Sequence, residues 1–119
     1  MSGLAEDTGG RLIAASKVTG TDVYDLTGAK IGSIYDVMLS KLTGRAEYAI
    51  MSFGGFLGVG KDYHPLPWSI LEYDPVKDGY VANVDMEKVK AAPSLTVEQI
   101  ATVWGDPAYG RTVTTYYIR

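Results

Sequence analysis

The chain has 119 residues, a net charge of −3 and no cysteine. This length predicts one domain with its own hydrophobic core, and the absence of cysteine excludes disulfides, thiolate metal ligands and cysteine nucleophiles. The acidic balance, with no run of lysine or arginine, disfavours nucleic-acid binding, which requires concentrated positive charge.

The N-terminal residues 1–11 show no hydrophobic periodicity, and we expect them to form a flexible tail. They carry acids and glycines where a signal peptide would have a basic start and an apolar run. No segment approaches the roughly 18 consecutive apolar residues of a membrane-spanning helix. We therefore expect a cytoplasmic protein that does not insert into a membrane.

From Leu12 onward, short segments rich in β-branched and aromatic residues alternate with turn sequences. This pattern predicts a small, mainly β unit. The expected strands cover residues 18–24, 31–42, 46–53, 62–68, 70–73 and 80–84. The first turn runs from Asp25 to Gly28, because aspartate can accept hydrogen bonds from its own turn and glycine accepts a positive φ.

Two of these strands do not alternate between apolar and polar residues. Residues 35–39 and 48–51 carry apolar side chains on both faces. Such strands are covered on both sides, either in a barrel with a packed exterior or at a contact between subunits. For so small a domain we expect that a partner chain can cover the outer face of these strands.

The C-terminal part changes to helical signals. A short turn or helix is expected over residues 86–92, behind Asp85 and before Pro93. A second helix is expected to begin at Thr96, which with Gln99 can form a capping box, while Leu95 can pack onto Ile100. One face of that helix is marked by Val97, Ile100, Ala101 and Trp104. The last stretch, 111–119, is rich in threonine, valine and tyrosine and is predicted to be a final strand or an arm.

The stretch from Gly55 to Lys61 spells G-x-x-x-x-G-K, close to a phosphate-binding loop. Asp62 stands where the motif requires a hydroxyl, and it would repel phosphate. Pro65 and Pro67 prevent the helix whose N-terminus would face the phosphate. We therefore interpret the glycines as a wide loop between two strands, and we expect no nucleotide site.

The remaining candidates for chemistry are few. His64 is the only histidine, which excludes a histidine-pair metal site, and we expect it to be a packed or surface residue. None of the serines lies in a G-x-S-x-G context. We predict no catalytic residue, no metal ligand and no cofactor, and thus no enzymatic activity.

Several motifs together resemble one known family. They are Asp25-x-x-Gly28-x-x-Ile31-Gly32, Val37-Met38-Leu39, Thr43-Gly44-Arg45, Tyr48-Ala49-Ile50 running into the 54–60 glycine loop, and Pro67-Trp68-Ser69. Over about residues 16–95 the chain resembles the PRC-barrel domain. That resemblance implies a mainly β fold, a small and highly curved β-barrel with a short C-terminal helical segment. Together with the tail and the final strand or arm expected above, the layout is a tail at 1–11, the barrel at 12–95, and the helix with its strand or arm at 96–119.

The resemblance also implies a function through contact rather than catalysis. PRC-barrel domains occur in the cytoplasmic part of the photosynthetic reaction-centre H subunit, in the C-terminal half of a ribosome-maturation factor, and as free-standing bacterial and archaeal proteins. This chain looks like the free-standing kind. We expect a protein–protein interaction or adaptor module whose partner is a protein, in the first place a second copy of itself. The expected interface residues are Phe53, Phe56, Leu57, Tyr63, Trp104, Tyr116 and Tyr117. The alternative is a small-ligand-binding domain in which the glycine loop, Tyr63, His64 and Trp68 rim a cleft.

Overall fold

The computed structural model describes residues 12–54 and 61–118. The elements in chain order are α1 (Ala15–Val18), β1 (Asp22–Tyr24), β2 (Lys30–Leu39), β3 (Ala46–Gly54), β4 (Lys61–Pro67), the 3-10 turn η3 (Trp68–Ile70), β5 (Leu71–Asp74), β6 (Gly79–Ala82), α2 (Met86–Ala91), α3 (Val97–Thr102), the 3-10 turn η4 (Val103–Gly105) and α4 (Pro107–Tyr117). Strands β2 to β6 lie close to the ranges predicted from the sequence.

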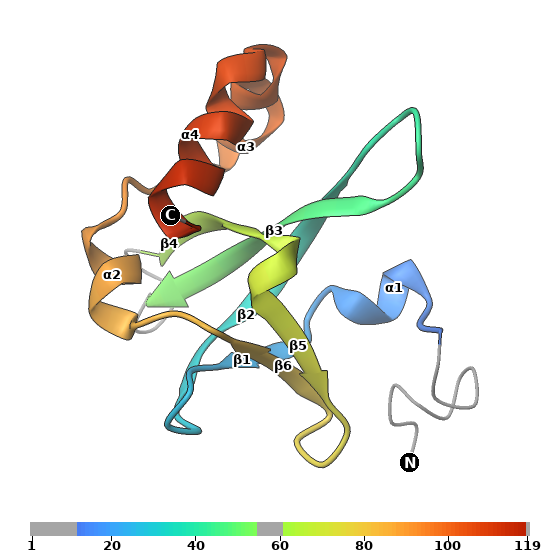
Figure 1. The fold of residues 1–119 in the computed structure, drawn as a ribbon, viewed down its shortest axis with the longest axis vertical. Helices are drawn as coiled ribbons and strands as arrows, with labels where there is room; N and C mark the ends of the chain where they lie inside the picture. Colours follow the sequence, from blue (N-terminus) through green and yellow to red (C-terminus); the bar gives the residue numbers. More distant parts are fainter. Residues whose placement is uncertain (1–11, 55–60, 119) are drawn as a thin grey trace.

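The six strands form one sheet in the order β4-β3-β2-β1-β6-β5. All neighbouring strands are antiparallel except β1 and β6, which run parallel. The sheet curls into a half-barrel, and α3 and α4 lie together outside it, beside β3 and β4 (Figure 1). The prediction of a small, mainly β, strongly curved fold with a short C-terminal helical segment is confirmed.

The first turn has the predicted chemistry. The Asp25 carboxylate accepts hydrogen bonds from the N–H groups of Thr27 and Ala29, at 2.9 and 3.1 Å, and from the Thr27 hydroxyl at 2.6 Å. The hydroxyl bond is the main reason that the pKa of Asp25 lies below its ordinary value. Gly28 has a φ of +92°, a conformation that favours glycine.

Buried apolar side chains form two clusters, one on each face of the sheet. The larger one fills the inside of the curl and includes Val23, Ile34, Met51, Leu66 and, from α2, Val89. The smaller one lies on the outer face, where Ile50 packs with Leu95 and Ile100.

Strand β3 separates these two clusters, and its residues 49–52 are all buried. The prediction that this strand is covered on both faces is confirmed. Its outer cover, however, is supplied by the chain's own C-terminal segment and not by a second chain. The same prediction for residues 35–39 of β2 is wrong, because Tyr35, Asp36 and Leu39 are exposed.

The first predicted strand is wrong in its N-terminal half. Residues 18–24 do not form one strand, because Ala15–Val18 is a helical turn and only Asp22–Tyr24 is extended. The Thr21 hydroxyl donates to the Lys17 carbonyl at 2.8 Å and ties the chain back onto that turn. A threonine that bonds a preceding carbonyl competes with strand formation.

Helix α3 begins as predicted. Thr96 and Gln99 form the reciprocal capping box, with bonds of 3.2 and 2.9 Å, and Leu95 and Ile100 belong to the same apolar cluster. The predicted apolar face is only partly right, because Val97 and Ala101 are exposed. The helix is so short that only Ile100 of its six residues is buried.

The predicted final strand or arm at 111–119 is wrong, because this stretch lies mostly in the helix α4. Asp106 caps the helix by accepting the Ala108 N–H at 2.9 Å, and Pro107 occupies the first turn, where its missing donor is harmless. Val113 and Tyr117, four residues apart, then face the sheet side of the helix. This packing overrides the preference of threonine, valine and tyrosine for strands.

Candidate interaction surfaces

The structure does not gather the predicted interface residues into one exposed patch. Phe56 and Leu57 lie outside the described residues. Phe53 packs against the inner cluster, with its ring 5.5 Å from that of His64. The other four are partly buried. Tyr63 and Trp104 pack against the outer cluster, whereas Tyr117, on α4, packs against the inner one. Tyr116 is its neighbour on α4.

The residues proposed to rim a ligand cleft also separate. Tyr63 faces outward, where its ring lies 4.8 Å from that of Tyr35. His64 is the next residue of the same strand and points inward, where only 2% of it is exposed. Trp68 packs against the inner cluster with its ring 5.5 Å from that of Tyr80. These three side chains therefore do not share a cleft.

The helical cover of β3 is held by an aromatic and hydrogen-bonded contact. The Trp104 ring lies 4.9 Å from that of Tyr48 and 5.0 Å from that of Tyr109. The Tyr48 hydroxyl donates to the Gly110 carbonyl at 2.8 Å and is 2.9 Å from the Thr114 hydroxyl. A Cβ atom on Gly110 would lie 2.8 Å from the Tyr48 hydroxyl oxygen, so the absence of a side chain there allows α4 to approach β3 closely.

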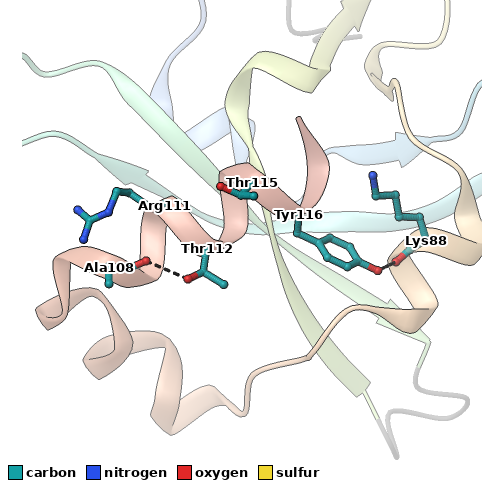
Figure 2. A pocket seen from close by; sticks show the side chains of 6 residues that line it. All are labelled: Lys88, Ala108, Arg111, Thr112, Thr115 and Tyr116. Carbon is teal, nitrogen blue, oxygen red and sulfur yellow. Dashed lines mark hydrogen bonds between the residues drawn. The ribbon is translucent and has the colours of Figure 1, made fainter. Parts of the chain in front are cut away.

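A groove runs between α2 and α4. Figure 2 shows its lining, which consists of Lys88, Ala108, Arg111, Thr112, Thr115 and Tyr116; the groove is open to solvent and has a volume of about 670 Å³. The Tyr116 hydroxyl donates to the Lys88 carbonyl at 2.7 Å, and the Lys88 ammonium lies 5.4 Å from the centre of the Tyr116 ring. These contacts tie α2 to the C-terminal end of α4.

A smaller recess adjoins this groove and shares Thr112 and Tyr116 with it. It has a volume of about 140 Å³ and is otherwise lined by Pro65, Ala92, Pro93, Tyr109, Val113 and Tyr117. Among the described residues the Tyr117 hydroxyl has no hydrogen-bond partner, although it is buried. Burial is the main cause that raises the pKa of Tyr117 above its ordinary value.

The β2–β3 hairpin projects from the body of the molecule (Figure 1). Its turn is held by the Ser40 hydroxyl, which accepts the N–H groups of Leu42 and Thr43 at 3.2 Å each. Two apolar side chains at this end face solvent, because Leu39 is 55% and Leu42 is 97% exposed. Tyr35, near the base of the hairpin, is also exposed.

The described residues contain no arrangement typical of a catalytic centre. Both ring nitrogens of His64 lack a hydrogen-bond partner among them, and burial lowers the pKa of this imidazole although the charge of Asp62 opposes that shift. The Ser52 hydroxyl pairs with the Ser33 hydroxyl at 3.1 Å rather than with a base. No group of three potential metal-binding side chains occurs in residues 12–54 and 61–118.

The near-match to a phosphate-binding loop can be judged from its flanks. Gly54 and Lys61 are paired residues of the antiparallel strands β3 and β4, and residues 55–60 between them lie outside the description. Lys61 is followed by a strand, not by a helix. A phosphate-binding loop requires that helix, so the interpretation as a connection between two strands is confirmed.

Sequence reasoning missed both exposed surfaces described above. The groove was missed because it exists only if residues 107–117 are helical. The hairpin carried a local signal, since Leu39 and Leu42 stand beside the Thr43-Gly44 turn, where polar residues are usual.

Three further findings bear on identity. In the part of the chain that the structure describes, no helix has the length and apolar character needed to cross a bilayer. No curated protein matches the sequence. The model of one family, described as the PRC-barrel domain, matches residues 10–89, which is more than half of the chain. The curled sheet formed by β1 to β6 falls within that match, and the chain belongs to the PRC-barrel domain family.

Proposed function

We propose that this protein is a non-enzymatic interaction module that pairs with a second copy of itself through the β2–β3 hairpin. The observation that carries the proposal is the hairpin itself, a projecting element with apolar side chains at its end. The family supports a role through contact. The lack of cysteine supports a reducing, cytoplasmic setting.

The backbone of β2 offers an edge that a second strand can pair. Strand β1 pairs with β2 only between Lys30 and Ser33, and the last bonds on that side join Ile34 to Gly20 and Thr21. Beyond Ile34, β3 is the only described strand beside β2. A strand with one free edge can accept another strand, and two identical edges can pair about a two-fold axis.

The charges along the hairpin favour an antiparallel pairing of two copies. Lys41 and Arg45 are exposed near the turn, and Asp36 and Glu47 are exposed along the strands. None of the four belongs to an ion pair among the described residues. An antiparallel arrangement places the basic end of one hairpin beside the acidic strands of the other, and the exposed leucines then lie within the contact.

Light scattering on the purified protein at micromolar concentration tests this proposal. We expect a mass twice the 12.8 kDa of one chain. Burial of a leucine contributes about 1.5–3 kcal/mol, so a Leu39→Asp/Leu42→Asp variant should weaken the dimer by at least about 100-fold and give the mass of a monomer.

A matched control is available on another turn. Val76 is 93% exposed in the turn between β5 and β6, so Val76→Asp removes an equally exposed apolar side chain far along the chain from the hairpin. This variant should remain dimeric. Two results would rule out the hairpin as the contact. One is a wild-type protein that is strictly monomeric, and the other is a dimer that Leu39→Asp/Leu42→Asp leaves intact.

A further inference from the structure

The groove between α2 and α4 has features that the hairpin contact does not use. Lys88 and Arg111 lie toward its two ends, because Lys88 contacts Tyr116 while Arg111 lies five residues earlier on α4 (Figure 2). In the described part of the chain, the two ion pairs involve Lys30 and Lys90 instead. The groove therefore presents two cations without carboxylate partners in a chain whose net charge is negative.

Polar and apolar groups between these cations suit an extended polypeptide. The Thr112 hydroxyl donates to the Ala108 carbonyl at 3.1 Å, whereas that of Thr115 has no hydrogen-bond partner among the described residues. The adjoining recess of about 140 Å³ is close to the size of a cavity that holds one benzene ring. It can accommodate one apolar side chain but not the body of a larger organic ligand.

We infer that the α2–α4 groove is a docking site for an acidic segment of a different protein, with one apolar side chain in the recess and carboxylates beside Lys88 and Arg111. A membrane surface fits less well, because a flat bilayer does not enter a concave recess and two cations attract it weakly. The inference does not depend on self-association, since none of the groove residues lies in the hairpin.

Fluorescence polarisation with a labelled seven-residue peptide, one phenylalanine flanked on each side by three glutamates, tests the inference. We expect saturable binding that weakens with salt, and no binding of two matched peptides, one with lysines for the glutamates and one with serine for the phenylalanine. Lys88→Glu/Arg111→Glu should weaken binding by about tenfold or more. Lys17→Glu, which reverses an exposed charge on α1 outside the groove, should leave it unchanged.

A further variant separates this site from the proposed dimer contact. Leu39→Asp/Leu42→Asp should bind the peptide as the wild type does, whatever its oligomeric state. The inference is overturned if no acidic peptide binds at millimolar concentration, if the lysine peptide binds equally, or if the groove variants bind normally. Association only with vesicles containing 30% phosphatidylserine would also overturn it.

Discussion

The contact between β3 and α4 gives the sharpest test of the packing. It predicts that Gly110→Ala destabilises the wild type but stabilises a Tyr48→Phe variant. Gly110→Ala improves helix propensity by about 1 kcal/mol. In the wild type, however, the new Cβ would lie 2.8 Å from the Tyr48 hydroxyl oxygen, which must move away. That movement breaks the bonds to the Gly110 carbonyl and the Thr114 hydroxyl, each of which contributes about 0.5–1.5 kcal/mol. We expect Gly110→Ala to destabilise the wild type by about 1 kcal/mol.

In a Tyr48→Phe background the result reverses. The hydroxyl is absent, and the nearest atom to the new Cβ is the ring Cζ at 3.4 Å, which is a tolerable contact. Gly110→Ala should then stabilise the protein by about 0.5–1 kcal/mol through helix propensity alone. The coupling energy between the two substitutions is therefore about 1.5–2 kcal/mol, well above the 0.5 kcal/mol expected of independent sites.

Urea unfolding of the four proteins of this cycle measures the coupling. A change of 1 kcal/mol moves the midpoint by about 0.5–1 M for a protein of this size. Gly105→Ala serves as the control, because a Cβ at Gly105 would meet no atom within 4 Å. Additive effects, or a stabilising Gly110→Ala in the wild type, would refute the close approach of Tyr48 to α4.

Two further predictions concern the inside of the half-barrel. Burial lowers the pKa of His64 in the folded state below its ordinary 6.5. As the pH falls, the imidazole of the unfolded chain therefore takes up a proton before that of the folded protein does. The free energy of unfolding should be highest above pH 6.5 and should fall by up to about 1.4 kcal/mol per pH unit below it. Urea unfolding from pH 8 to pH 5 checks this, and a His64→Leu variant with the same pH dependence would contradict it. Gly32→Ala places a Cβ against the Ser52 carbonyl oxygen and 2.9 Å from the Met51 Cγ, so it should destabilise the protein by about 2–3 kcal/mol or more. A thermal melt close to that of the wild type would show that β2 and β3 can move apart at this position.

The parts of the fold that were predicted correctly depend on short-range chemistry. Asp25 and Gly28 determine their turn whatever surrounds them, and Thr96 and Gln99 form their cap within four residues. The strands that follow Asp25 could be placed because turn residues mark their ends. The two prolines that follow Lys61 similarly exclude a helix through their own backbone geometry, whatever packs around them.

Helix α4 and the surfaces it creates depend on contacts with residues that are distant along the chain. Such contacts cannot be read from the sequence alone. Its threonines and tyrosines favour strands, and only the Asp106-Pro107 start indicates a helix. What decides the conformation is packing, since Val113 is buried and the Tyr48 hydroxyl bonds to the Gly110 carbonyl, 62 residues away in sequence. The groove and its recess therefore could not be predicted. The same holds for the inward orientation of His64, which follows from the register of β4 against β3.

Because β3 is buried on both faces, it contributes side chains to both apolar clusters. An amide at residues 49–52 can reach solvent only after both the half-barrel and the helical cover have opened. Local openings that expose one cluster leave these amides protected, so hydrogen exchange there reports the global unfolding of the molecule. The helices that lie beyond the family match are thus expected to unfold together with the sheet, as one cooperative unit.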